Sequence, residues 1–544
     1  MRASRADLVV CGEVVVAAGL SGLETAEAIG ISAGRVVNTG TRRDVTDAAA
    51  PAARVVDAGH AAVIPGLHDF HMHLVGLARA RGRVRLDDAT NGVEVVDRLR
   101  AAAAELDQGA WLAGRGWSEA QLSSVAVGAL DEAVGEHPAF VTSHDGHSAW
   151  ASSAALRLAG VRAATTDPRG GRLERDPHGA PTGILRETAL DLVAPLVERR
   201  HGDALREPLD ATLRELAAFG ITGASEAGDY TDANGIGADA ALGDSYSSLT
   251  DLAGLVDGRL RLTLGIPVDA IATAASGGLR TGAMLEDRRT MRFGWAKEYA
   301  DGALGSGTAA LFGSRSCGDG GTGILRVDPD ELDALFAAAR PACIGLAVHA
   351  IGDRAAATVL DAVGRAPDRS AGVPHDRMEH AQLLRAGDLP RFAALRVTAS
   401  IQPIHAAADR DLVEACWDGR QGDAYAWRSL VEAGAHLAAG SDAPVESVNP
   451  WLGMFAAVHR RLPTDSRSDW RPAEALTVVE ALRAYTIGPA RAIDAADEGH
   501  LRPGARADLA VLSADLATVL EADDRLADVR SVLSFVDGAE VPIG

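Results

Sequence analysis

The chain has 544 residues, 47% of them hydrophobic, and a formal net charge of −22. Its length is sufficient for one large barrel with additions or for about two to four domains. The excess of acidic over basic residues, and the mixing of arginines among the acidic residues, argue against nucleic acid or an anionic membrane as a partner.

The four cysteines lie far apart and form no CxxC pair; they are Cys11, Cys317, Cys343 and Cys416. This spacing argues against a disulfide framework or a cysteine-based zinc site, and it is typical of a reducing cytosol. The N-terminal apolar run is short and interrupted by acids, unlike a signal peptide. No stretch approaches the roughly 18 apolar residues of a membrane span. We therefore expect a cytoplasmic protein.

Residues 6–62 are short runs rich in valine and isoleucine, broken by Gly, Asn and Asp, as in strands joined by turns. The same pattern returns in 500–516 and 530–543. We expect both chain ends to build one small β-sandwich, residues 1–62 and 494–544, with a second domain, 63–493, between them.

The second domain begins with an apolar run that ends in His71-Met72-His73. Residues i and i+2 of a strand face the same side, so these two imidazoles can bind one metal ion. HxH is common by chance, but its place at a strand end favours a metal site.

The less regular residues 76–210 follow, and their Gly/Pro-rich stretch 166–183 indicates a long loop.

From residue 220 onward, apolar runs alternate with helical patterns, which argues for a parallel sheet or barrel. The expected strands are 220–228, 260–268, 292–300, 345–353, 375–382, 396–405 and 436–445. With the HxH strand they number eight, as in a (β/α)8 TIM-like barrel of the α/β class. A plain barrel repeats about every 30 residues. Residues 76–210 are therefore a large insertion after strand 1, expected to cap the barrel mouth.

Lys297, on the fourth expected strand, is the one lysine among 53 basic residues, so the other 52 (53 minus one) are arginines. Arginine replaces lysine in salt bridges, but it cannot supply a compact amine that loses its proton. A lone lysine therefore indicates chemistry that a guanidinium cannot perform. Chance survival in a GC-biased coding sequence is the alternative.

Five of the expected strands end in residues that bind metal or can be converted to do so. They are His71, His73, Lys297, His349, His380 and Asp442. Barrel enzymes carry their chemistry at this edge. Taken singly, the histidines could be hydrogen-bonded core residues, and Asp442 a cap or turn residue. As a set, they favour a metal centre.

Nine motifs run in order through essentially the whole chain: VIPGLHDFHMHL, DGHSAW, PTGILRE, KEYADGALGS, HAIGDRA, EHAQ, QPIH, GSDAP and ADLAVLSAD. The sequence resembles the amidohydrolase superfamily, and more narrowly its family 3 branch, which includes N-substituted formamide deformylase-like enzymes.

The resemblance implies two divalent ions, one held by His71, His73 and Asp442 and the other by His349 and His380. Lys297, carboxylated by CO₂, would bridge both, because a carbamate offers two anionic oxygens and arginine stays protonated. Such ions, about 3.5–4 Å apart, hold a bridging hydroxide and polarise a carbonyl. Asp442 would serve as general base and then acid. We expect Zn²⁺, with Mn²⁺ or Fe²⁺ as alternatives.

The resemblance also implies substrate-binding positions. His147 and Trp150 in DGHSAW and Glu187 in PTGILRE resemble pocket-lining residues, with loop packing as an equal alternative. His405 ends the seventh strand and is expected to touch substrate.

The expected activity is hydrolysis of a non-peptide C–N bond in a small molecule: an amide, an N-substituted formamide or a cyclic amide. The same barrel can host lactone, ester or phosphotriester hydrolysis, or deamination at a mononuclear site, since fold does not fix function. A metal-free structural relative would be expected to have lost ligands, and all six positions carry suitable residues. A homodimer is expected from the resemblance alone.

Overall fold

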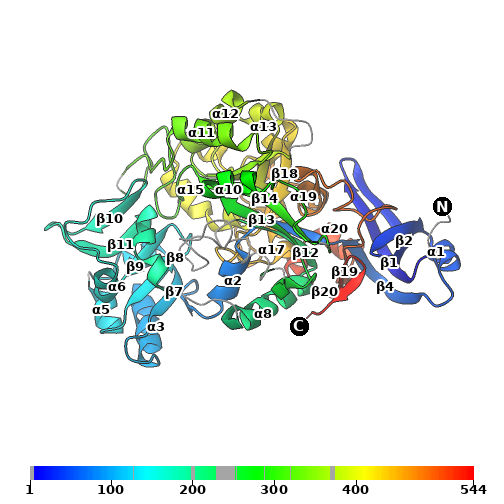
Figure 1. Ribbon diagram of the computed structural model, residues 1–544, viewed down its shortest axis with the longest axis horizontal. Helices are drawn as coiled ribbons and strands as arrows, with labels where there is room; N and C mark the ends of the chain where they lie inside the picture. The colour runs from blue at the N-terminus through cyan, green and yellow to red at the C-terminus, as the bar shows by residue number, and fades with distance from the viewer. Residues whose placement is uncertain are drawn as a thin grey trace.

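The computed structural model describes residues 5–126, 128–197, 203–227, 252, 254–286, 288–318, 320–367 and 374–543. Its central feature is an eight-stranded parallel sheet that closes almost completely into a barrel (Figure 1). The strands are β5 (Leu67–Met72), β12 (Ile221–Glu226), β13 (Arg261–Pro267), β14 (Met291–Tyr299), β15 (Leu346–Ala350), β16 (Asp376–His380), β17 (Val397–Ile401) and β18 (His436–Ala439). The expected barrel is confirmed, strand by strand.

Several barrel strands are buried along their whole length, because helices cover the outside of the sheet and side chains fill the inside. This holds for β12, β15, β16 and β17. The outer helices include α8 (Asp203–Ala218), α11 (Pro329–Ala339), α12 (Asp353–Arg365), α13 (Leu389–Leu395) and α17 (Pro450–His459). Charged residues within these buried strands therefore need partners inside the protein.

The first and last barrel strands meet at a seam of hydrogen bonds just beyond the end of β18. The Asp442 amide donates to the His71 carbonyl at 2.7 Å, and the His73 amide donates to the Ala443 carbonyl at 2.8 Å. Asp69 Oδ1 accepts from the amides of Ser441, at 2.9 Å, and His71, at 3.2 Å. The seam brings the HxH strand and the turn of Asp442 together.

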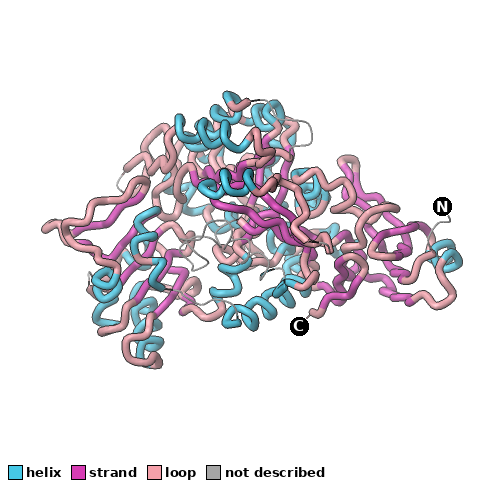
Figure 2. Tube along the Cα trace, viewed as in Figure 1, coloured by secondary structure: helices cyan, strands magenta, loops and turns pink. Residues whose placement is uncertain are grey.

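The chain ends form one continuous seven-stranded sheet, beside the barrel in Figure 2. Its order is β21 (Ala539–Val541), β20 (Ser531–Val536), β19 (Leu509–Asp515), β4 (Arg54–Pro65), β1 (Leu8–Gly19), β2 (Gly22–Ser32) and β3 (Arg35–Gly40). β4 enters the barrel through Gly66, where an added Cβ would lie 1.9 Å from Thr222 Oγ1, so only glycine fits. Buried Arg261 pairs with Asp508 at 2.7 Å and Asp537 at 2.9 Å, which ties the barrel to this sheet.

Between β5 and β12 lies a folded unit, which we call the cap, built on a six-stranded sheet at the opposite side of the barrel (Figure 1). Its strands are β6 (Val84–Arg85), β7 (Leu112–Trp117), β8 (Ala139–Ser143), β9 (Ser148–Ala151), β10 (Gly171–Arg175) and β11 (Pro181–Glu187). Helices α3 (Gly92–Ala104) and α5 (Ala129–Val134) pack with it around an apolar core.

The prediction of a long loop at 166–183 is wrong, because β10 and the start of β11 form a hairpin there. Two of the glycines that suggested a loop, Gly170 and Gly179, lie in turns with φ values of +75° and +86°, whereas Gly171 and Gly183 lie in the strands. The domain limits of 1–62, 63–493 and 494–544, with 76–210 as the inserted segment, stay predictions.

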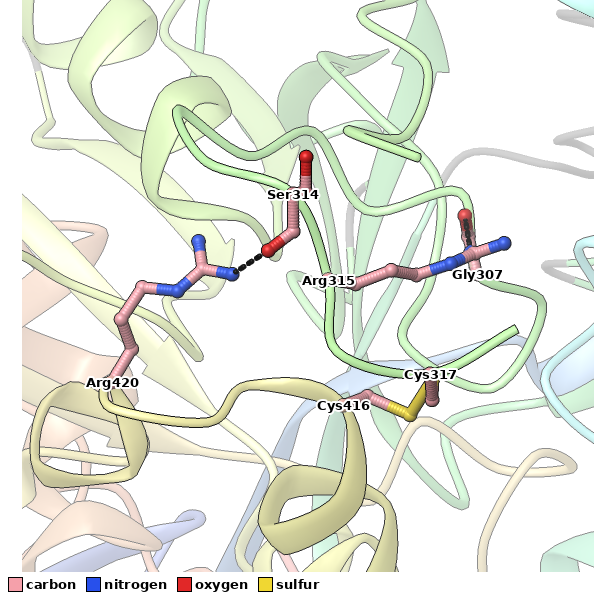
Figure 3. The surroundings of a disulfide bond; sticks show 6 residues. All are labelled: Gly307, Ser314, Arg315, Cys317, Cys416 and Arg420. Carbon is pink, nitrogen blue, oxygen red and sulfur yellow. Dashed lines mark hydrogen bonds between the residues drawn. A yellow bond between two sulfur atoms is a disulfide. The ribbon is translucent and has the colours of Figure 1, made fainter. Parts of the chain in front are cut away.

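Cys317 and Cys416 form a disulfide, with their Cα atoms 4.7 Å apart (Figure 3). Cys11 and Cys343 are free thiols. The expectation that the separated cysteines stay unpaired is wrong, and the argument from them for a reducing cytosol loses its support. The partners are 99 residues apart. They meet because the loop after β14 and α15 (Arg410–Cys416) both follow barrel strands at the same edge.

Among the helices in the described ranges, none combines the length and apolar character that crossing a membrane requires.

Replacing Cys416 by serine is expected to lower the free energy of unfolding by about 2–4 kcal/mol, because the cross-link closes a long loop in the unfolded chain. Denaturant melts with and without dithiothreitol measure this difference. C343S, which removes a free thiol, is the matched control and should leave the effect of reductant unchanged. A wild-type melt that is insensitive to reductant would contradict the pairing.

Candidate metal centre

The six residues predicted as metal ligands lie at the carboxyl ends of the barrel strands. His71 and His73 lie at the end of β5 and just after it, Lys297 in β14, His349 in β15, His380 at the end of β16 and Asp442 after β18. All are buried except His73, whose side chain is 19% exposed. The barrel thus gathers side chains that are far apart in the sequence.

The carboxylate of Asp442 contacts three imidazoles. Oδ1 lies 3.0 Å from His73 Nε2 and 3.3 Å from His71 Nε2, and Oδ2 lies 3.1 Å from His405 Nε2. Burial opposes ionisation, but the imidazoles of His71, His405 and His73 outweigh it and hold the pKa of Asp442 well below its usual range. The group is therefore an anion able to bind a cation.

The first candidate ligand group is His71, His73 and Asp442, whose ligand atoms lie within 4.8 Å of one another. His71 Nδ1 contacts the buried carboxylate of Glu379. A carboxylate at Nδ1 makes that nitrogen the donor and leaves the lone pair on Nε2, which faces Asp442. This is the usual arrangement of a metal-ligating histidine and its carboxylate partner.

The second candidate group is His380, His405 and Asp442, with the same 4.8 Å limit. His380 has φ +72°, and its buried Nδ1 has no hydrogen-bond partner among the described residues. A buried ring nitrogen without a partner costs free energy, which a bound cation would offset. The structure places His405, predicted to bind substrate, directly in this group.

His349 lies beside the second group rather than in it. Its ring centroid is 4.5 Å from that of His380, and its Nε2 is 3.1 Å from the Gly302 carbonyl. A ring that donates from Nε2 keeps the lone pair of Nδ1 available. Burial lowers the pKa of His349 well below its usual value, and the neighbouring imidazoles and Lys297 lower it further. Burial and cationic neighbours also lower the pKa of His380 well below its usual value. Both rings are neutral, as ligation requires.

Lys297 is 5% exposed and lines the same small internal cavity as His71, Glu226 and Glu379. Its Nζ lies 4.6 Å from the centroid of the Tyr299 ring, which in turn lies 5.3 Å from the His349 ring. The lysine therefore shares a cavity with one of the candidate ligands, His71, and with the Glu379 carboxylate that contacts it.

Glu379 is a site residue that the sequence reasoning missed. It lies next to His380 in the EHAQ motif, and its pKa is held well below the usual range because Arg377 and His71 outweigh burial. Arg377 Nη2 lies 3.0 Å from Glu379 Oε2. Strand alternation suggests opposite faces for neighbours such as Glu379 and His380. The positive φ of His380 breaks that alternation.

The cap places His147 and Glu187, which are predicted to bind substrate, beside the histidines of the barrel. The His147 ring centroid is 4.9 Å from that of His349. His147 Nδ1 lies 2.9 Å from Glu187 Oε2, which also accepts from Arg326 Nη1 at 3.1 Å. Trp150, for which substrate binding and packing were equal alternatives, lies in the apolar core of the cap, with Val141 and Ile184 among its neighbours. No described contact joins Trp150 to the histidines of the barrel.

The similarity to known proteins extends over nearly the whole chain. The amidohydrolase family model matches residues 54–542. Protein LONG AFTER FAR-RED 3 of Arabidopsis thaliana is 31% identical over 522 residues, which cover 93% of this chain and 87% of the plant protein. N-substituted formamide deformylase of Arthrobacter pascens is 30% identical over 540 residues, 94% of each chain.

Among solved structures, a metal-dependent hydrolase from Pyrococcus horikoshii matches with a TM-score of 0.73 and 25% identity over 94% of this chain and 99% of that one. The barrel, its clustered histidines and these similarities agree. The chain belongs to the amidohydrolase family of metal-dependent hydrolases.

Proposed function

We propose that this amidohydrolase hydrolyses a non-peptide C–N bond of a small molecule: an amide, an N-substituted formamide or a cyclic amide. The observation that carries the proposal is the ionised Asp442 carboxylate among the imidazoles of His71, His73 and His405 at the barrel mouth. The similarity to N-substituted formamide deformylase along 94% of both chains supports this class of bond.

The residues fit two divalent ions, for which Zn²⁺ is our first choice and Mn²⁺ or Fe²⁺ the alternatives. His71, His73 and Asp442 would hold one ion, His349 and His380 the other, and a CO₂-derived carbamate on Lys297 would bridge both. The fit is supported by the buried, unpartnered Nδ1 of His380 and by neutral imidazoles with lone pairs free. When bound, the ions supply Lewis-acid activation of water and of the carbonyl.

The protein's own groups would handle the proton. Asp442 accepts it from the attacking water and delivers it to the leaving nitrogen, which otherwise departs as a poor leaving group. Glu379 keeps His71 in the tautomer that faces Asp442. His147, oriented by Glu187, would donate to the substrate. The cap around His147 would exclude bulk water from the reacting bond.

Protein purified without chelator is expected to contain about two divalent ions per chain. Removing them with a chelator should abolish hydrolysis, and adding Zn²⁺ should restore it, because the water and the carbonyl lose their activation together. Elemental analysis and activity are measured on the same samples. Less than about one ion per chain, with no gain from Zn²⁺ or Mn²⁺, would rule out the metal-dependent reaction.

Lys297→Ala is expected to remove most activity, and small carboxylic acids are expected to restore part of it by supplying the missing anionic oxygens. Lys297→Arg is the matched control and should resist rescue, because its guanidinium fills the space and stays protonated. The native intact mass of the wild type should exceed the combined mass of the sequence and its bound ions by one CO₂. An unmodified lysine in metal-loaded protein would contradict the bridging role.

A hydrolysis screen with metal-loaded enzyme tests the class of bond. N-formyl, N-acyl and lactam substrates should give the highest kcat/KM, and lactones and phosphotriesters the lowest. A clear preference for lactones or phosphotriesters would overturn the proposed bond class while leaving the metal centre intact.

A further inference from the structure

Glu446 lies in the turn after β18, shortly after Asp442, and its side chain is 13% exposed. A single oxygen, Oε1, lies 3.2 Å from His144 Nε2 and 3.8 Å from His405 Nδ1. His144 belongs to the cap, between β8 and β9, and His405 belongs to α14 (Pro403–Ala408), directly after β17. One partly buried carboxylate thus joins the cap to the candidate metal centre.

The imidazole of His405 lies between two carboxylates, because its Nε2 is 3.1 Å from Asp442 Oδ2. His71 repeats this construction, with Glu379 at Nδ1 and Asp442 at Nε2. Asp442 is therefore flanked by two imidazoles, each with a glutamate behind it. Glu379 contacts His71 Nδ1 directly, whereas Glu446 faces His405 Nδ1 at 3.8 Å, an ion-pair distance that orients the ring through charge and not through a hydrogen bond.

The cap contacts the same turn through further side chains. His144 Nδ1 lies 3.2 Å from Asp87 Oδ1, and Asp87 Oδ2 lies 3.4 Å from Arg115 Nη1. Arg115 also donates to the Pro444 carbonyl. Asp442 itself has φ +60°, an uncommon conformation that persists only when its surroundings hold it. The Arg115 and His144 side chains of the cap supply part of that support.

We propose that Glu446 is a positioning residue that fixes His405 against Asp442 and docks the cap on the turn that carries Asp442. The Glu446 carboxylate would then both hold the cap against the barrel and keep His405 beside Asp442, the proposed base. The effect on catalysis rests on the proposed function, in which Asp442 transfers the proton. The positioning itself is a property of the fold and can be measured separately.

The alternative is that Glu446 only holds the cap to the barrel and does not position His405, because other ion pairs also join the cap to the barrel. Arg169 provides the comparison, because its Nη2 lies 2.7 Å from both Asp328 Oδ2 and Glu331 Oε2 of the barrel. Its side chain is 63% exposed. An exposed cap–barrel pair of this kind has no described contact with His405 or Asp442.

The test compares full-length E446L, E446Q and R169Q, all metal-loaded, on the best amide of the screen. E446L is expected to lower kcat about 10–100-fold, with a much smaller change in KM, as for loss of the carboxylate partner of a site histidine. E446Q keeps the shape and one acceptor oxygen, so it should recover part of kcat. R169Q should leave kcat unchanged.

Hydrogen–deuterium exchange provides the readout that does not depend on activity. E446L should increase exchange in residues 440–446 and in the cap around residues 143–147, whereas R169Q should leave the turn protected. If kcat and turn exchange in E446L equal those of the wild type, or if R169Q produces the same losses, the positioning role is overturned. A wild type that hydrolyses none of the amides defeats the proposed function instead, and the exchange comparison still decides the role of Glu446.

Discussion

The structure depends on the closure of the barrel at one seam. The seam joins the strand of His71 and His73 to the turn of Asp442 through paired backbone bonds of 2.7 and 2.8 Å. Buried Asp69 adds bonds to the amides of His71 and Ser441, and burial raises its pKa to about 6. Because the seam joins residues that are far apart in the sequence, the Asp442 carboxylate meets its imidazoles only when the barrel is complete.

The cap is more than a cover for the barrel mouth. It has its own sheet and apolar core, so it presents side chains from a defined framework. His147 reaches the ring of His349, while Arg115 and His144 reach the turn after Asp442. On the loop after β14, Ser306 bonds to Asp145 at 2.6 Å and to Ser148 at 3.1 Å. The cap thus contacts two barrel loops that flank the site, the turn after Asp442 and the loop after β14.

Much of this arrangement could be predicted from the sequence, because parallel strands place their carboxyl ends at one edge. His71, His349 and Asp442 follow apolar runs, and the lone Lys297 stands out by composition. Partners that act across strands were not predictable: Glu379 and Glu446 are identified only by which imidazole they face. The same holds for the Cys317–Cys416 pair and for Trp150, whose burial depends on the packing of the cap. The local sequence pattern predicts which strand end carries a side chain, whereas the residue that this side chain contacts is determined by the tertiary structure.

We propose that these residues hold two ions in a hydrolytic centre bridged by Lys297. Anomalous diffraction from crystals of Zn²⁺-loaded protein tests it most directly. We expect one anomalous peak among His71, His73 and Asp442, a second beside His349 and His380, and electron density extending beyond Lys297 Nζ between them. Crystals of metal-loaded protein with no anomalous peak at His71, His73 and Asp442 would contradict it.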